Sequence, residues 1–183
     1  MHRKFNNIIS VMSSLLRMII IKIFHFNKFS FNGIQRFSPN VSIEFDNGAK
    51  FKLGKKVRAH SGVKIKIRSN GKLVIKDNVS FNYNCMVFCH DSITIEEGVE
   101  FGPGVLIYDH DHDYKIPGGI KAGRFTTGEV FIGKNVWIGA NSIILKETNI
   151  GHNCVIAAGS VVKGNIPDNS ILIQKKNTKI IDI

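Results

Sequence analysis

A six-residue repeat runs through most of this 183-residue chain and limits the folds that it can adopt. With Leu53 as the first position of a hexad, the repeat continues to Val162, with three longer intervals on the way. A helix repeats its apolar positions every 3.6 residues and a strand every two, so neither gives a period of six. The first position is apolar in all twelve hexads: Leu53, Ala59, Ile75, Phe81, Ile95, Phe101, Ile132, Ile138, Ile144, Ile150, Ile156 and Val162.

The fourth and fifth positions of the hexads are as restricted as the first. The fifth position holds only small or β-branched residues: Val57, Val63, Val79, Cys85, Val99, Val105, Val136, Ser142, Thr148, Cys154, Ser160 and Ile166. The fourth position is Gly or Asn in ten of the twelve hexads, and Lys56 and Glu147 are the exceptions. Gly and Asn tolerate the positive φ of a tight turn, and a coil of three short strands buries the other two positions. The pattern therefore predicts an all-β chain, folded as a left-handed parallel β-helix.

Longer intervals mark insertions in this predicted β-helix domain, residues 31–183. The chain runs 37 residues from Ile95 to Ile132, against about 18 for a coil of three hexads. The excess of about 19 residues is expected to leave the prism after Ile107, as a loop over residues 108–131. Loops on rigid scaffolds carry functional groups, so a site is expected here. An irregular first coil is expected over residues 31–52, with a core of Val41, Ile43, Phe45 and Phe51.

Residues 1–30 form a separate segment, with a helix predicted over residues 7–27. Its apolar side chains leave only a narrow polar stripe. Arg17 and Lys22 interrupt the apolar run before it reaches about 20 residues, so a spanning helix is not expected. No small-residue cleavage site of a signal peptide follows. Two compatible interpretations stay open: the helix caps the open end of the repeat array, or it lies in a membrane interface.

The charge of the chain is unevenly distributed. Residues 1–76 hold 16 Lys and Arg against two acids, a balance of +14, whereas residues 77–183 hold 9 against 12, a balance of −3. A basic half can face nucleic acid, an anionic membrane or a phosphate-bearing substrate. No nucleic-acid module is visible, so a membrane or an anionic glycan carrier is favoured. Three cysteines without a secretory signal indicate free thiols in the cytoplasm, with or without peripheral contact at the inner face of the cytoplasmic membrane.

The run IGKNVWIGANSIILKETNIGHNCVIAAGSVVKGNIP, with FGPGV and IYDHDHDY before it, resembles the hexapeptide-repeat acyltransferases. The resemblance is nearest to the maltose/galactoside and polysaccharide (O-antigen or capsule) O-acetyltransferases. It implies a homotrimer with active sites between subunits. It also implies transfer of an acetyl group from acetyl-CoA to a sugar hydroxyl, in the synthesis of a cell-surface polysaccharide. A xenobiotic acetyltransferase of the streptogramin type is an alternative.

In that family a His on the long loop acts as the general base. Imidazole suits this role because its pKa lies near cytosolic pH. Alignment on the step from Pro103 to Val105 places the base at His112, and His110 is the alternative. Carboxylates that could orient the imidazole are Asp109, Asp111 and Asp113.

The resemblance also implies binding residues. The acetyl-CoA site is carried over to Trp137 and Ala140 on one coil, and to Ala158 and Lys163 on the next. Lys179 lies in a C-terminal stretch that departs from the family pattern, and it is the candidate for a contact with the CoA phosphates. Acceptor-binding candidates are Asn82, Asn84 and Asp91.

A metal site is the remaining alternative, because the gamma-class carbonic anhydrases share this fold and bind zinc through three His. His90, His110 and His112 are the possible ligands here. His110 and His112 are separated by one residue, whereas the family's pair is separated by four, so three-His zinc geometry is not favoured. The expectation is therefore an enzyme without a metal.

Overall fold

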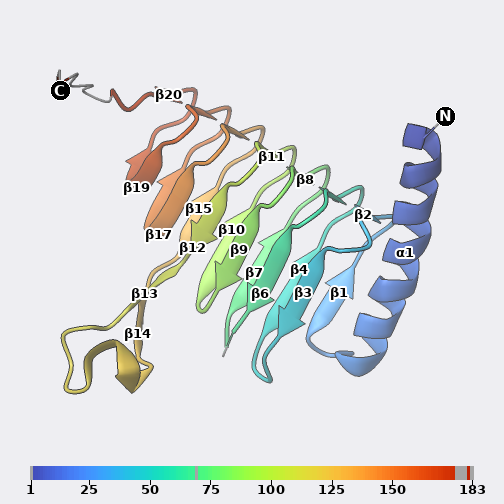
Figure 1. Cartoon of the computed structure of the whole chain (residues 1–183), viewed down its shortest axis with the longest axis horizontal. Coiled ribbons are helices and arrows are strands. Elements are labelled where there is room, and N and C mark those ends of the chain that lie inside the picture. Colours follow the sequence, from blue (N-terminus) through green and yellow to red (C-terminus); the bar gives the residue numbers. More distant parts are fainter. Residues whose placement is uncertain (1, 69, 176–180, 182–183) are drawn as a thin grey trace.

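The computed structural model of the chain describes residues 2–68, 70–175 and 181. Its strands stack in parallel along one axis and form a three-sided prism (Figure 1). One face holds β1 (Phe29–Phe31), β4 (Lys50–Leu53), β7 (Lys72–Ile75), β10 (Ser92–Ile95) and β15 (Val130–Ile132). The second holds β2 (Arg36–Phe37), β5 (Arg58–Ala59), β8 (Ser80–Phe81), β11 (Glu100–Phe101), β16 (Trp137–Ile138), β18 (Val155–Ile156) and β20 (Ile171–Leu172). The third holds β3 (Ser42–Phe45), β6 (Lys64–Ile67), β9 (Met86–Cys89) and β12 (Leu106–Tyr108), and the long strands β17 (Ile143–Ile150) and β19 (Val161–Ile166) continue both the first and third faces.

The burial of the side chains confirms the hexad columns. Every first-position side chain is buried, and eleven of the twelve fifth-position side chains are buried as well. Ile166, the last of the fifth positions, is only partly buried, against the C-terminal end of the core. The first coil begins at Phe29, two residues earlier than expected, and Phe29, Phe37 and Phe51 fill its interior. The prism is therefore one continuous apolar column.

The fourth position keeps its turn conformation even where the sequence does not show it. Lys56 has a φ of 57° and Glu147 a φ of 60°, in the same left-handed region as the Gly and Asn residues of this column. The column is thus set by the backbone turn, and these two side chains are tolerated in it. Asn165 fits the column in sequence but not in conformation. It lies within β19, and the positive φ of this turn, 87°, belongs to Gly164.

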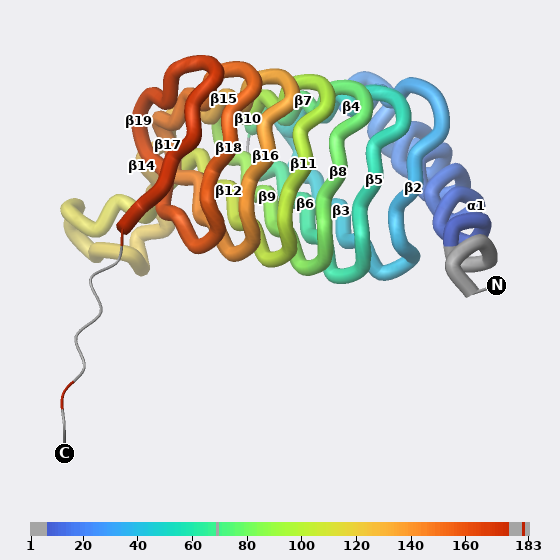
Figure 2. The backbone as a smooth tube through the Cα atoms, turned by 90° about the horizontal axis from the view of Figure 1, so that it is seen from above, coloured from blue at the N-terminus to red at the C-terminus, as the bar shows by residue number. Residues whose placement is uncertain are grey.

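The N-terminal helix α1 (His2–Phe24) starts and ends earlier than predicted. It lies against the first coil at one end of the prism (Figure 2). Met18 is buried, and the backbone N–H of Phe37 donates to the Ser14 hydroxyl over 2.7 Å. Arg17 donates to the carbonyl of Val41 over 2.6 Å and to that of Pro39. Burial lowers the pKa of the Arg17 guanidinium, although Arg remains charged.

The side of α1 that faces away from the prism is apolar. Leu16 is 63% exposed and Ile20 45% exposed, and several further apolar side chains accompany them. Residues 7–24, which include Arg17 and Lys22, are long and apolar enough to cross a membrane by length and composition alone. A core helix or a signal sequence would meet the same criterion, and only 17% of this stretch is buried.

The long excursion is a hairpin and not an irregular loop. β13 (His110–His112) pairs antiparallel with β14 (Phe125–Thr127), and a short 3-10 helix η1 (Gly119–Ala122) lies near the tip. The hairpin leaves the prism after Tyr108 and rejoins it at Val130 (Figure 1). It projects from the edge between the first and third faces.

Candidate active site

A buried carboxylate stands at the root of the hairpin. Asp109 has no exposed surface. It accepts hydrogen bonds from the backbone N–H groups of His90 and Asp91, each over 2.8 Å, and lies 3.1 Å from Nδ1 of His110. Burial alone would raise the pKa of Asp109, but these hydrogen bonds lower it below its usual value. The carboxylate is therefore ionised and fixed in place.

His110 is held within a group of aromatic rings. Its side chain is 11% exposed, and its ring centroid lies 3.8 Å from that of His90 and 5.3 Å from that of Phe125. Burial, and then repulsion from His110, lowers the pKa of His90, which favours its neutral form. Since Nδ1 of His110 faces Asp109, the other ring nitrogen, Nε2, can accept a hydrogen bond or a proton.

His112 lies two residues further out and is exposed. Its ring packs on Phe125 at 4.7 Å between centroids. Lys146 ties this part of the hairpin to the prism, since its Nζ lies 2.6 Å from the Thr126 hydroxyl and 3.6 Å from the carboxylate of Asp111. Nothing in the sequence singles out Phe125 or Lys146. The partners of Phe125 lie across the hairpin, and Lys146 reaches the hairpin from β17. The imidazole of His112 thus projects from the prism on β13, a strand that is held by β14 and by Lys146.

Three of the residues expected to bind acetyl-CoA meet on the edge between the second and third faces. Trp137, on β16, is 58% exposed. Ala140 and Ala158 occupy consecutive turns, and the N–H of Gly159 donates to the Ala140 carbonyl over 2.8 Å. A methyl group at Gly139 would come within 2.5 Å of the Ala158 nitrogen. A side chain at Gly139 would therefore prevent the coils from stacking closely at this edge.

The two lysines of the expected acetyl-CoA site are not part of this edge. Lys163 lies on β19, toward the edge that carries the hairpin, and its Nζ is 3.2 Å from the carboxylate of Glu147. Lys179 lies outside the described residues.

The residues expected to bind the acceptor are divided between two edges. Asn82 and Asn84 lie in the turn between β8 and β9, where the Asn82 side chain accepts from the Tyr83 N–H over 2.9 Å. Asn84 has a φ of 58°, so it adopts the left-handed turn conformation of the fourth column. Asp91 lies at the opposite end of β9, beside the root of the hairpin.

The possible zinc ligands do not form a metal site in the described part of the chain. His90 and His110 stack as rings, whereas His112 contacts Phe125 further along the hairpin. Among the described residues, no group of three or more His, Cys, Asp or Glu side chains is arranged to hold an ion. The three cysteines are free and buried.

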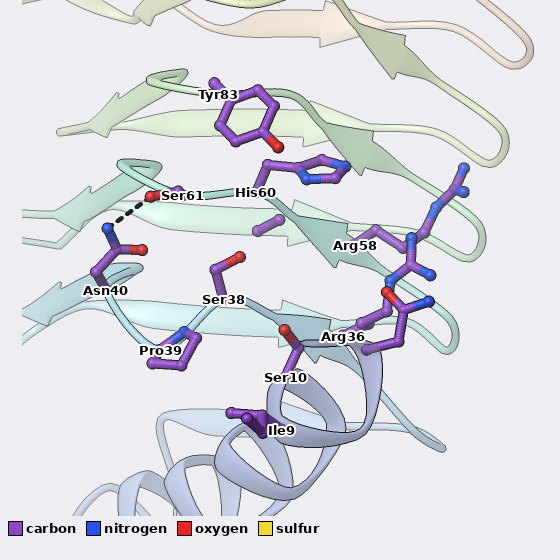
Figure 3. A pocket seen from close by; sticks show the side chains of 12 residues that line it. Ile9, Ser10, Arg36, Ser38, Pro39, Asn40, Arg58, His60, Ser61 and Tyr83 are labelled. Atoms are coloured by element: carbon purple, nitrogen blue, oxygen red, sulfur yellow. Dashed lines mark hydrogen bonds between the residues drawn. The ribbon is translucent and has the colours of Figure 1, made fainter. Parts of the chain in front are cut away.

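A groove of about 870 Å³ lies beside α1 (Figure 3). It is on the edge between the second and third faces, the edge that also carries Trp137. Arg36 and Arg58 line one side of it, and His60 and Tyr83 contribute rings. None of these groove residues was expected from the sequence to bind a ligand. The signal was a spacing of 22 residues between the two arginines, which equals one coil and places them in register on neighbouring strands.

The repeat and the fold have known relatives. Residues 129–164 match the family described as Bacterial transferase hexapeptide (six repeats). Over 136 residues the chain is 29% identical to the putative lipopolysaccharide biosynthesis O-acetyl transferase WbbJ of Escherichia coli, across 69% of this chain and 68% of that protein. Over 90 residues it is 39% identical to a galactoside O-acetyltransferase of Lactococcus lactis, across 49% and 43%. The chain spans about half the length of several such relatives.

Solved structures share the architecture. The N-acyltransferase AntD from Bacillus cereus, in complex with dTDP and coenzyme A, aligns over 84% of this chain and 82% of its own, with a TM-score of 0.67 and 23% identity. A maltose O-acetyltransferase from Clostridium difficile aligns over 82% and 67%, with a TM-score of 0.51 and 26% identity.

Fold and repeat together define a left-handed parallel β-helix of hexapeptide repeats. Within that class, the expected resemblance to the hexapeptide-repeat acyltransferases is confirmed.

Proposed function

We propose that this protein transfers the acetyl group of acetyl-CoA to a sugar hydroxyl, in the synthesis of a cell-surface polysaccharide. The observation that carries this proposal is the projecting imidazole of His112, next to a root fixed by Asp109 and His110. The relatives named as sugar O-acetyltransferases support the same chemistry.

His112 acts as the general base and His110 as a positioning residue. His110 is largely enclosed between His90 and Phe125, so its ring serves to hold the hairpin. His112 is exposed on the projecting strand, where a bound hydroxyl can approach it. The base takes the hydroxyl proton as the oxygen bonds to the thioester carbonyl carbon. The carbon–sulfur bond then breaks, and CoA leaves as its thiol after receiving the proton.

The acetyl-CoA site is proposed at the edge that carries Trp137, Ala140 and Ala158. The small side chains of Ala140 and Ala158 leave room for a pantetheine chain, and the exposed indole of Trp137 offers a flat surface. Lys163 and Lys179 are the proposed contacts for the CoA phosphates. Acceptor contacts are assigned to Asn82, Asn84 and Asp91.

A homotrimer is proposed, with active sites between subunits. The outward side of the third face supports it, because Met86, Phe88, Leu106 and Ile143 are only partly covered in one chain. The Phe88 and Tyr108 rings stack on this face at 5.2 Å. Such a contiguous apolar surface is typical of contacts between subunits. A neighbouring chain would bring the Trp137 edge toward the hairpin edge.

The protein is proposed to work in the cytoplasm, at the inner surface of the cytoplasmic membrane. The outward apolar side of α1 and the +14 balance of residues 1–76 support this location. Apolar side chains would enter the interface, and the basic residues would face anionic headgroups.

Two alanine variants test the assignment of the base. CoA release in the presence of sugar acceptors is measured for His112→Ala and His110→Ala, alongside the thermal unfolding midpoint. His112→Ala is expected to lower the rate by about 10²–10⁴-fold with little change in stability. His110→Ala is expected to lower stability and to retain more activity. The reverse result would show that His110 is the base.

A further inference from the structure

The groove beside α1 has walls from two different parts of the chain. Helix α1 contributes Ile9 and Ser10, and strands and turns of the prism contribute the rest (Figure 3). No Asp or Glu is among the side chains that line it. The groove lies within the part of the chain that carries the +14 balance, so its field favours an anion.

Two guanidinium groups are placed side by side in this groove. Arg36 and Arg58 are register partners on β2 and β5, so their side chains leave the same face about 4.8 Å apart. Nη2 of Arg58 donates a hydrogen bond to the carboxylate of Glu100 over 2.8 Å. This contact uses one of the three guanidinium nitrogens of Arg58. Guanidinium groups bind phosphate through paired N–H donors. Two neighbouring guanidinium groups match two linked phosphoryl groups.

Next to the arginines, the groove offers groups that suit a sugar. The His60 and Tyr83 rings lie 4.9 Å apart, and Tyr83 is 52% exposed. The Asn40 side-chain amide donates to the Ser61 hydroxyl over 2.6 Å, which fixes two polar groups at the groove wall. The C–H face of a sugar ring can pack on an exposed phenol, while amides and hydroxyls pair with the hydroxyl groups of the sugar.

We propose that this groove binds a diphosphate that carries a sugar. The favoured source is a membrane-borne glycan carrier, because α1 forms one wall and turns an apolar side outward. A soluble nucleotide diphosphate sugar has the same chemistry and is the other source. The role of this ligand as the acetyl acceptor rests on the proposed acyl transfer. Its binding in the groove does not depend on that transfer.

Titration calorimetry of the full chain, without acetyl-CoA, tests the inference. The probes are inorganic pyrophosphate and a uridine diphosphate sugar. Replacing both arginines, Arg36→Gln with Arg58→Gln, is expected to weaken the binding of both probes at least about tenfold. The matched control, Lys50→Gln with Lys52→Gln, removes the same charge from exposed positions on β4 and is expected to change affinity less than about twofold. Equal affinity of wild type and the arginine variant, or equal losses in both variants, would overturn the inference.

A second variant keeps the test decisive if the arginine variant does not fold. Tyr83→Leu is expected to weaken binding of the diphosphate sugar and to leave pyrophosphate unaffected. Unchanged sugar binding would contradict the proposed arrangement.

Vesicle flotation distinguishes the two sources. Phosphatidylcholine vesicles with and without a polyprenyl diphosphate are compared, with phosphatidylserine vesicles matched in charge. Selective recruitment by the polyprenyl diphosphate, lost on replacing both arginines, supports the membrane source. Binding of the uridine diphosphate sugar alone assigns the groove to a soluble nucleotide diphosphate sugar. Binding of neither overturns the proposal, whether or not the protein proves to be an acetyltransferase.

Discussion

Oδ1 of Asp109 lies 3.1 Å from Nδ1 of His110, and this contact joins the hairpin to the prism. The same carboxylate accepts hydrogen bonds from the backbone N–H groups of His90 and Asp91, which lie in the preceding coil. One side chain therefore holds two coils and the first imidazole of the hairpin in a fixed relation. The position of His112, two residues further along, depends on that fixed root.

The first prediction concerns the stability of this root in acid. The folded state lowers the pKa of Asp109, so the unfolded chain binds the proton more readily. The stabilisation is therefore present above the unfolded pKa, about 3.9, and is lost as the pH falls through the lower folded value. Urea unfolding of the wild type between pH 6 and pH 3 is expected to show this loss.

Asp109→Asn is the matching variant. Its amide would turn a donor toward backbone N–H groups, so the free energy of unfolding at pH 7 is expected to fall by about 1–3 kcal/mol. The acid-dependent component should be missing from this variant. An equally steep pH dependence in Asp109→Asn would show that other carboxylates cause it.

The second prediction concerns the left-handed turn at Lys56. A residue with a side chain is strained at a φ of 57°, whereas Gly is not. Lys56→Gly is expected to raise the free energy of unfolding by about 1 kcal/mol. Lys52→Gly, in the extended strand β4, should lower it by roughly 0.5–1 kcal/mol. Two losses of similar size would contradict this explanation of the fourth column.

The third prediction concerns the proposed trimer. Leu106 points outward from the third face and is only partly covered in one chain. Leu106→Lys would place a charge within the proposed contact between subunits, so sedimentation velocity is expected to show smaller species than for the wild type. Thr94→Lys, on the first face, serves as the control and should leave the assembly unchanged. A monomeric wild type would remove the basis for sites between subunits.

The fourth prediction separates membrane contact from capping. Deleting α1 would uncover the first coil, where Met18 is buried, so substitutions on the outward side are preferable. Leu16→Glu with Ile20→Glu is expected to lower partition into phosphatidylglycerol vesicles at least tenfold, since burying each side chain contributes about 1.5–3 kcal/mol. The unfolding midpoint should stay the same. Unchanged partition would leave α1 with a capping role alone.

The hexad columns predicted the prism because each column corresponds to one backbone position, repeated in every coil. The first and fifth columns contain most of the buried apolar side chains from Leu53 onward. The remainder lie on the longer strands, outside both columns: Ile65, Ile67, Leu73, Val87, Cys89, Ile93, Ile107 and Val130. The excursion was visible as a break in phase, but its hairpin shape was not. That shape depends on Phe125 packing against His110 and His112, across the two strands.

The groove was beyond the reach of sequence reasoning for a similar reason. Its walls depend on the docking of α1 through Ser14 and Arg17, and on the pairing of Arg36 with Arg58 one coil apart. The docking of α1 has no periodic signal, and the spacing of 22 residues between the two arginines identifies one coil only once the register of β2 and β5 is known. The distribution of charge indicated an anionic partner, and the structure adds a place where one can bind.

The most direct measurement of the central proposal follows a labelled acetyl group. Purified wild-type protein is incubated with acetyl-labelled acetyl-CoA and a set of mono- and oligosaccharides. The label is expected to appear in an alkali-labile ester on a sugar, in step with release of CoA, and to be lost in His112→Ala. CoA release without a labelled sugar, or equal labelling by His112→Ala, would contradict the proposed transfer.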